Sequence, residues 1–356
     1  MTALTSKERA ALLAIALLTA LAGVAEYGDW AAVPSFLIAM LALAGLAWVV
    51  SFATEQLGER FGPALTGVLQ STLGNLPELF VVVFALKKGE LVVAQTAIVG
   101  SILANALLVL GLVIVIGARR SGDGVMRFSK GLPRDTATLL LVAVFIIVLL
   151  GLSLGSHDPA SHHVKAISIV GAICLLVVYA TWVIPYLRSD VRPEADPAAA
   201  REGPRLPLRV VIVLLLSAGV ASAFVSDWFV AALRPAIDTL SLSQAFAGLV
   251  IVAIAGNAVE NTAGLVLAAK GHFDLAISVV KNSVAQIAAF LFPVLVLISF
   301  SLSTTLTFSL APVYIGALAL TALVLAQITG DGRAAAFEGW ALVALYVVLA
   351  TFTLYE

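Results

Sequence analysis

The sequence predicts an all-α polytopic membrane protein with about eleven transmembrane helices, one at the N-terminus followed by two inverted-topology repeats of five. Three observations support this fold class: the composition, a series of long apolar runs, and an internal repeat. Of the 356 residues, 61% are hydrophobic and 12% are charged. A soluble domain has about 45–50% apolar and about 25% charged residues. The apolar excess is therefore larger than a water-soluble core requires.

The apolar runs have the length of membrane spans. A helix needs about 20 predominantly apolar residues to cross the hydrocarbon core of a bilayer. The first run is not followed by a clear small-residue cleavage site, so we interpret it as a span rather than a signal peptide. The predicted spans lie near residues 10–27, 33–53, 63–86, 91–117, 135–154, 164–187, 207–230, 240–269, 272–299, 307–327 and 337–355.

The distribution of Lys and Arg predicts the orientation. With a cytoplasmic N-terminus, fifteen basic residues fall in inside loops and four in outside loops. This bias predicts a multi-pass protein of the cell (plasma or inner) membrane, with its C-terminus outside. A net charge of −1 gives no indication of a nucleic-acid partner. The inside set is Lys7, Arg9, Arg60, Arg119, Arg120, Arg127, Lys130, Arg134, Arg188, Arg192, Arg201, Arg205, Arg209, Lys270 and Arg333; the outside set is Lys87, Lys88, Lys165 and Arg234.

A polar segment divides the chain into two similar halves. We predict an N-terminal helix in residues 1–30, repeats in 31–187 and 207–356, and a cytoplasmic linker in 188–206. Residues 74–116 align without a gap on residues 256–298, at an offset of 182. Because each repeat has an odd number of spans, the second copy enters the membrane from the opposite side. The matched residues are Gly74, Asn75, Glu78, Lys88, Gly89, Ala94 and Ser101 with Gly256, Asn257, Glu260, Lys270, Gly271, Ala276 and Ser283.

The central candidates for function are Glu78 and Glu260. A charged carboxylate at the centre of a membrane helix costs at least about 2.5–3.5 kcal/mol, so two at equivalent positions indicate a function. The alternative is a structural pair satisfied by a lysine or by backbone groups. Asn75 and Asn257 precede the two acids on the same helix faces.

The glycines before these acids favour a loosened helix. Gly74 and Gly256 destabilise a helix interior, and Pro77 lacks an amide hydrogen. Carbonyl groups released in this way can bind a cation, although close helix packing is an alternative explanation for each glycine.

The following spans add further oxygen atoms. Ser101 and Asn105 are one helical turn apart, and Ser283 and Gln286 are three residues apart. Any single serine can instead bond to its own helix. Taken together with Glu78 and Glu260 as the metal-binding acids, the set predicts an all-oxygen shell suited to a hard cation such as Ca²⁺.

Two close carboxylates also predict exchange of the cation for protons. When the site is empty, the like charges repel and one carboxylate tends to hold a proton. Ca²⁺ would then expel protons, and protonation would expel Ca²⁺. The sequence has no GxxxxGK[ST] nucleotide-binding loop, so an ion gradient is the expected energy source. We expect no cofactor, with Ca²⁺ and H⁺ as substrates.

Other functions remain open at this point. The protein could exchange Na⁺, K⁺ or Mn²⁺ for protons, or it could be a cation channel with uncoupled current. A membrane-embedded enzyme is the third alternative, but the sequence has no HExxH motif, no paired GxGD-type aspartates and no Ser/His pair at depth.

The chain resembles the cation/proton exchanger family of the cation/calcium exchanger superfamily. The motifs that carry the resemblance are ATEQLGERFG (53–62), STLGNLPEL (71–79), GSILANALLVLG (100–111), GNAVE (256–260) and the DG…FEG pattern of residues 331–339. The resemblance implies a Ca²⁺/H⁺ antiporter with Glu78 and Glu260 as essential acids. It also implies that Glu55 is an acid near the cytoplasmic entrance, where a solvated helix end is the alternative.

The chain departs from that family pattern at several positions. Members commonly have a histidine where this chain has Asn261, and Gly-Ser where it has Lys281-Asn282-Ser283. As an ammonium near Glu260, Lys281 would lower the affinity for a divalent ion or replace a bound cation. The alternative, which we favour, is a lysine that extends to the nearer membrane interface.

The remaining polar residues give weaker signals. His157, His162 and His163 are expected in an exposed loop, with transition-metal binding as the alternative. Cys174 is expected to pack as a small apolar residue. Asp331 and Glu338 are expected at helix boundaries. The sequence does not indicate an oligomeric state.

Overall fold

The computed structural model describes residues 4–61, 73–129, 131–188 and 205–356. These residues form two compact units. Unit 1 comprises Met1–Phe84, Ala180–Ser241 and Ala255–Val259, and unit 2 comprises Ala85–Tyr179, Leu242–Ile254 and Glu260–Glu356. Each unit takes segments from both halves of the sequence, so neither coincides with one predicted repeat.

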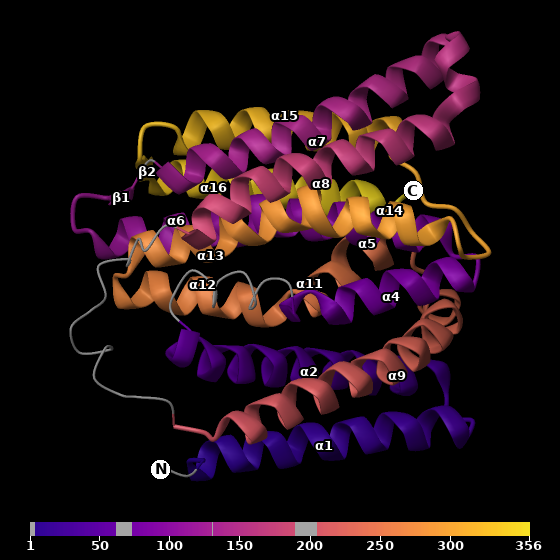
Figure 1. The fold of residues 1–356 in the computed structure, drawn as a ribbon, viewed down its shortest axis with the longest axis vertical. Helices are drawn as coiled ribbons and strands as arrows, with labels where there is room; N and C mark the ends of the chain where they lie inside the picture. The colour runs from indigo at the N-terminus through magenta and orange to yellow at the C-terminus, as the bar shows by residue number, and fades with distance from the viewer. Residues whose placement is uncertain (1–3, 62–72, 130, 189–204) are drawn as a thin grey trace. The chain divides into compact units, whose positions relative to one another are not determined.

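Unit 1 is built around three long helices. They are α1 (Ser6–Tyr27), α2 (Ala32–Phe61) and α9 (Leu208–Leu240), and α2 packs along α9 while α1 contacts both (Figure 1). Phe36 of α2 stacks on Phe229 of α9, with ring centroids 5.0 Å apart. The unit also contains the first part of α4 (Leu76–Lys87) and the end of α11 (Ala253–Gly256).

Unit 2 contains most of the other helices. Within it, α6 packs on α16, and α7 packs on α13 and α15. The helices with segments in this unit are the end of α4, α5 (Leu91–Leu103), α6 (Leu110–Arg120), α7 (Gly131–Ser156), α8 (Val164–Arg188), α10 (Gln244–Phe246), the start of α11, α12 (Ala258–Lys270), α13 (Phe273–Gln286), α14 (Phe292–Ser299), α15 (Pro312–Thr329) and α16 (Ala336–Leu354). The π-helical segments η1 (Ala104–Val109), η4 (Ala247–Val252) and η5 (Ile287–Leu291) and the 3₁₀ segment η2 (Pro159–His163) complete its helices.

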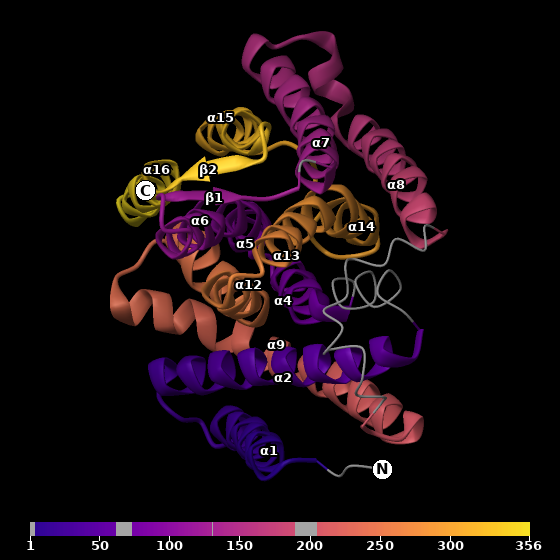
Figure 2. The same ribbon diagram turned by 90° about the vertical axis from the view of Figure 1, so that its left-hand side faces the viewer.

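A small antiparallel ribbon joins two loops of unit 2. Strand β1 (Val125–Arg127) pairs with β2 (Arg333–Ala335), placing Met126 opposite Ala334 (Figure 2). The Met126 side chain is fully buried. A Cβ added at Gly117 of α6 would lie 2.5 Å from its sulfur atom, so the ribbon packs directly against this helix.

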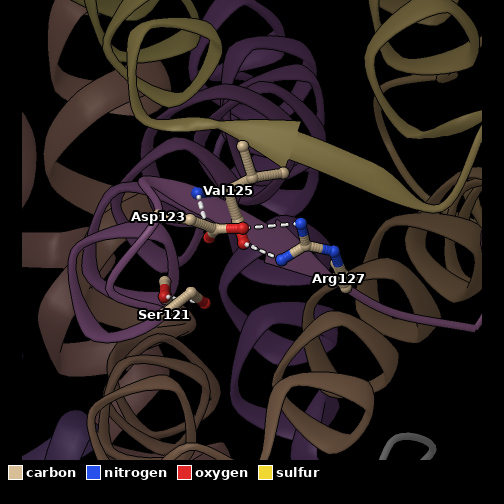
Figure 3. Close-up of polar contacts among 5 residues, drawn as sticks. Ser121, Asp123, Val125 and Arg127 are labelled. Atoms are coloured by element: carbon tan, nitrogen blue, oxygen red, sulfur yellow. Dashed lines mark hydrogen bonds and ion pairs between the residues drawn. The ribbon is translucent and has the colours of Figure 1, made fainter.

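The loop before β1 is held by an exposed ion pair. Asp123 accepts from the Arg127 guanidinium at 2.6 Å and from the Val125 amide at 3.2 Å (Figure 3). The bond from Arg127 is the main reason that the pKa of Asp123 lies below its ordinary value. The stabilisation from this pair is therefore present above the ordinary carboxyl pKa and is lost as the pH falls through the lowered one.

The predicted all-α membrane fold agrees with the structure apart from this ribbon. Among the described residues, nine helices are long and apolar enough to cross a membrane. The segments Gln244–Gly256 and Asn261–Lys270 form a bent pair, at 56°, that would make a tenth span. The predicted span at 63–86 and the linker at 188–206 lie partly outside the described residues, so the total of eleven stays a prediction.

One packing prediction was wrong. Cys174 is exposed on α8 and does not pack inside the protein. The histidines of the loop between α7 and α8 are exposed, as expected. Glu338 caps α16 by accepting from the Ala335 amide at 2.7 Å, and Asp331 accepts from the Arg333 amide at 3.0 Å, so both lie at the boundary between loop and helix.

Glycines allow close backbone contacts inside unit 2. A Cβ on Gly100 of α5 would lie 2.4 Å from the carbonyl oxygen of Leu249 in η4, and a Cβ on Gly248 would lie 2.0 Å from Oγ1 of Thr96. Van der Waals contact through small residues is a main source of stability between membrane helices. The α5–η4 contact therefore depends on the absence of side chains at these two positions.

We predict that Gly100→Ala destabilises the protein by about 1–3 kcal/mol, because the added methyl group meets backbone atoms that cannot rotate away. Thermal unfolding of the purified protein in detergent measures this effect. The matched control is Gly219→Ala in α9, where nothing lies within 4 Å of the added Cβ. The control should match the wild type or exceed it by up to about 1 kcal/mol through helix propensity. Equal melting of the Gly100 variant and the wild type would contradict the packing described.

Candidate functional site

The first GNxxE motif lies where a helix is interrupted. Residues 73 and 74 are helical, the helix breaks at Asn75, and α4 then begins at Leu76. Pro77 occupies the first turn of α4, where its missing amide hydrogen costs no hydrogen bond. Glu78 follows in the same turn, where the helix dipole favours a carboxylate. Asn75 and Glu78 are 5% and 2% exposed.

The second GNxxE motif repeats this local structure. Helix α11 ends at Gly256, the helix breaks at Asn257, and α12 begins at Ala258. Glu260 is the third residue of α12, as Glu78 is the third residue of α4. Asn257 is 2% exposed. The side chain of Glu260 lies outside the described part of the structure.

Within unit 1, the two motifs meet. A Cβ built on Gly256 would lie 3.8 Å from Cβ of Glu78, although the two residues are far apart in sequence. The glycine therefore brings bare backbone against the buried acid. A larger side chain at residue 256 would be directed into the space that adjoins Glu78.

Two serines of α9 extend this polar region, and the sequence analysis missed them. Ser226 donates a long hydrogen bond of 3.5 Å to the Pro77 carbonyl, one residue before Glu78. Ser222 lies one turn away on the same helix, and both serines are fully buried. Their spacing of four residues within an apolar span was the signal that could have identified them.

The remaining predicted oxygen ligands lie in unit 2. Asn105 of η1 donates from Nδ2 to Oγ of Ser283 in α13 at 3.2 Å, so the helices that follow the two motifs are joined by a buried hydrogen bond. Ser101 and Ser283 are each 1% exposed, and Gln286 is 2% exposed. The structure brings Asn105 and Ser283 together directly.

The π-helical segments of unit 2 also follow the repeat. Segment η1 begins at Ala104 and η5 begins at Ile287, which is within one residue of the offset of 182. A π-helical turn shifts the hydrogen-bond ladder and is often found at functional sites. In both halves, the shift falls beside a predicted polar ligand, Asn105 in η1 and Gln286 immediately before η5.

The two predicted modulating residues differ in their exposure. Glu55 is exposed on α2, six residues before that helix ends. Lys281 of α13 is only 3% exposed, and its Nζ donates to Oγ1 of Thr329 at 2.5 Å. The preferred expectation of a lysine that extends to an interface therefore does not describe Lys281, because α15 supplies a buried partner.

The chemistry of these residues is that of oxygen donors. Carboxylate, amide and hydroxyl groups bind hard cations such as Ca²⁺, which takes six to eight oxygen ligands. In the part of the chain that the structure describes, no group of three or more His, Cys, Asp or Glu residues could hold a metal ion.

The apolar helices and the paired motifs define the class of protein: a polytopic α-helical membrane protein with internally repeated, acidic helix breaks. Comparison with known proteins identifies the family. The family model described as "Sodium/calcium exchanger protein" matches residues 31–185 and 210–355. The chain belongs to this family, whose members are secondary transporters and not enzymes.

Similar proteins carry consistent names. The chain is 34% identical to a vacuolar calcium ion transporter from Schizosaccharomyces pombe, over 92% of this chain and 81% of that protein. It is 31% identical to a Ca²⁺/H⁺ antiporter from Aphanothece halophytica, over 90% of each.

Solved structures share the fold. The native YfkE structure matches with a TM-score of 0.80 and 26% identity, covering 97% of this chain and all of that one. The H⁺/Ca²⁺ exchanger CAX matches with a TM-score of 0.79 at 18% identity, covering 98% of this chain and 89% of that one.

We predict that the Asn105–Ser283 hydrogen bond shows a coupling of about 0.5–1.5 kcal/mol in a double-mutant cycle of Asn105→Ala and Ser283→Ala. Thermal unfolding in detergent provides the measurement. As a control, the cycle can be repeated with Ser168→Ala in place of Ser283→Ala. Ser168 is equally buried but accepts from the Phe308 amide, so its effect should add to that of Asn105→Ala. Additivity in both cycles would argue against the bond.

Proposed function

We propose that this protein is a secondary active antiporter that exchanges Ca²⁺ for H⁺ across a membrane. Its family and the names of its relatives support cation/proton exchange. The observation that carries the finer proposal is the contact in unit 1 between Gly256 of the second motif and Glu78 of the first. It supports a single site to which both halves of the sequence contribute.

In this proposal, Glu78 and Glu260 bind the cation and the protons in turn. Each acid lies in the first turn of a helix that follows a break, so carbonyl groups near the break are available as further ligands. Asn75, Asn257, Ser101, Asn105, Ser283 and Gln286 supply the neutral oxygen atoms. Gly74 and Gly256 provide the loosened backbone, and Glu55 lies near the cytoplasmic entrance.

Competition between Ca²⁺ and protons for the two carboxylates explains how the transport of one is coupled to the transport of the other. Two carboxylates neutralise one Ca²⁺, and protonation of either removes part of the charge that holds the metal. The cation and the protons then cannot occupy the site together. A site that opens to one side of the membrane at a time would convert this competition into exchange. We propose that it lies near the midplane, as in other transporters built from inverted repeats.

Transport by Glu78→Gln and Glu260→Gln tests the proposal. Uptake of ⁴⁵Ca²⁺ into vesicles, driven by an imposed pH gradient, should fall to background in each variant, because neither retains both exchangeable protons. Asp29→Asn is the matched control, since Asp29 is exposed in the loop between α1 and α2. Its positive φ of 51° is one that asparagine tolerates.

Retained coupling in either glutamine variant would reject the mechanism. The same vesicles identify the substrate, because Na⁺, K⁺ and Mn²⁺ can each be tested for the ability to collapse the pH gradient. Uncoupled current in the absence of a proton gradient would instead indicate a channel.

A graded series at residue 256 tests the space beside Glu78. Gly256→Ala places a methyl group in ordinary contact with Glu78, so uptake should stay within a few-fold of the wild type. Gly256→Leu should abolish uptake while the protein remains folded, because the longer side chain occupies the space proposed for the cation.

The control for this series is Gly219→Leu, at an open position on α9. Uptake by this variant should match the wild type. Wild-type uptake by Gly256→Leu would show that the space beside Glu78 is not used.

A further inference from the structure

Lys281 is a buried basic side chain with a defined position in unit 2. It lies on α13, and its Nζ donates to Thr329 Oγ1 on α15. The Thr329 hydroxyl donates its own hydrogen to the Leu325 carbonyl at 2.7 Å, so its oxygen is oriented to accept from the lysine. Both residues are at most 3% exposed.

The end of α15 favours a positive charge at this point. Thr329 is the last residue of α15, and the final carbonyl groups of a helix carry a partial negative charge. A narrow cavity adjoins the lysine and is lined by Ala106, Thr136, Leu140 and Leu325 among others. The walls are mainly apolar, so a charge held here is screened less than a charge on the surface.

The same lysine lies close to the oxygen ligands of α13. Ser283 is two residues after Lys281 on α13. The second ligand, Asn105, directly precedes Ala106, and Ala106 lines the same cavity as Lys281. The side chains diverge, however: Ser283 accepts from Asn105 of η1, whereas Lys281 reaches Thr329 of α15. An ammonium at Lys281 could therefore act on a cation at these ligands through its electric field.

We propose that Lys281 is a built-in positive charge that determines cation preference, weakening the binding of divalent ions more than that of monovalent ions. This inference rests on the proposed cation site. Coulomb energy is proportional to the charge of the bound ion, so the free-energy effect on Ca²⁺ is twice that on Na⁺. At a pH where the carboxylates of the empty site are ionised, and for one Na⁺ in place of one Ca²⁺, the fold-change in affinity for Ca²⁺ is then the square of that for Na⁺.

The expected magnitude depends on the separation between the ammonium and the cation, for which we take an illustrative value. At a separation of about 10 Å and an effective dielectric constant of about 20, removing the charge strengthens monovalent binding on the order of tenfold and Ca²⁺ binding on the order of a hundredfold. The squared relation between the two values does not depend on the distance chosen. If the substitution changed only the packing, the two fold-changes in affinity would have no reason to follow this relation.

The test compares Lys281→Met, which removes the charge at similar volume, with Lys281→Arg, which retains it. Equilibrium binding of ⁴⁵Ca²⁺ to the purified full chain gives Kd, and displacement of ⁴⁵Ca²⁺ by Na⁺ gives the monovalent affinity. In Lys281→Met, the Kd for Ca²⁺ should fall on the order of a hundredfold. The Kd for Na⁺, calculated from the Na⁺ concentration that displaces half of the bound ⁴⁵Ca²⁺, should fall on the order of tenfold. Lys281→Arg should stay within about threefold of the wild type.

A second charge-retaining variant covers the case in which arginine does not fit the narrow cavity. Thr329→Ser keeps both the acceptor oxygen and the ammonium while it changes the packing, so its Kd for Ca²⁺ should also stay within about threefold of the wild type. A Lys281→Met protein with an unchanged Kd, or with equal fold-changes for the two ions, would overturn the inference.

The two proposals fail in different ways. A wild-type protein that binds no Ca²⁺ and shows no uptake driven by a pH gradient would overturn the proposed function, and this inference with it. Normal uptake by the wild type, together with a Kd for Ca²⁺ that is the same in Lys281→Met as in the wild type, would overturn the role of Lys281 alone.

Discussion

The free energy of burying charge in apolar helices is the constraint on which this structure depends. Glu78 is 2% exposed within a chain that is 61% hydrophobic, and Lys281 is 3% exposed. Neither charge is tolerated at such a position without polar groups nearby. Glu78 lies in the first turn of α4, where the helix dipole favours a negative charge. The side chain of Lys281 extends from α13 to the last turn of α15, where the dipole favours a positive charge.

The same constraint accounts for features that recur in both halves. Helix breaks fall at Asn75 and Asn257. The helices that follow, α4 and α12, are each succeeded within two residues by a glycine of positive φ: Gly89 at 82° and Gly271 at 89°. Only glycine adopts this backbone conformation without strain. The π-helical segments η1 and η5 repeat as well. The glutamate of each GNxxE motif is therefore accompanied by the same set of backbone irregularities in both halves.

Much of this arrangement could be predicted from the sequence, because its signals are local. Apolar runs of membrane length identify the spans, and the GNxxE repeat identifies the two acids and their helix breaks. The contacts between distant segments could not be predicted. The position of Gly256 against Glu78, the approach of Ser226 to Pro77 and the bond from Lys281 to Thr329 all depend on tertiary packing. The β1–β2 ribbon was missed because three-residue strands in polar loops leave no periodic pattern.

Proton release on metal binding tests the central claim most directly. Ca²⁺ added to the purified protein in weakly buffered detergent solution should release protons, because the metal and the protons compete for the same two carboxylates. We predict between one and two protons per bound Ca²⁺ at a pH where the empty site is protonated, and a smaller number in Glu78→Gln. Saturable Ca²⁺ binding without proton release at any pH between about 5 and about 8 would contradict the account.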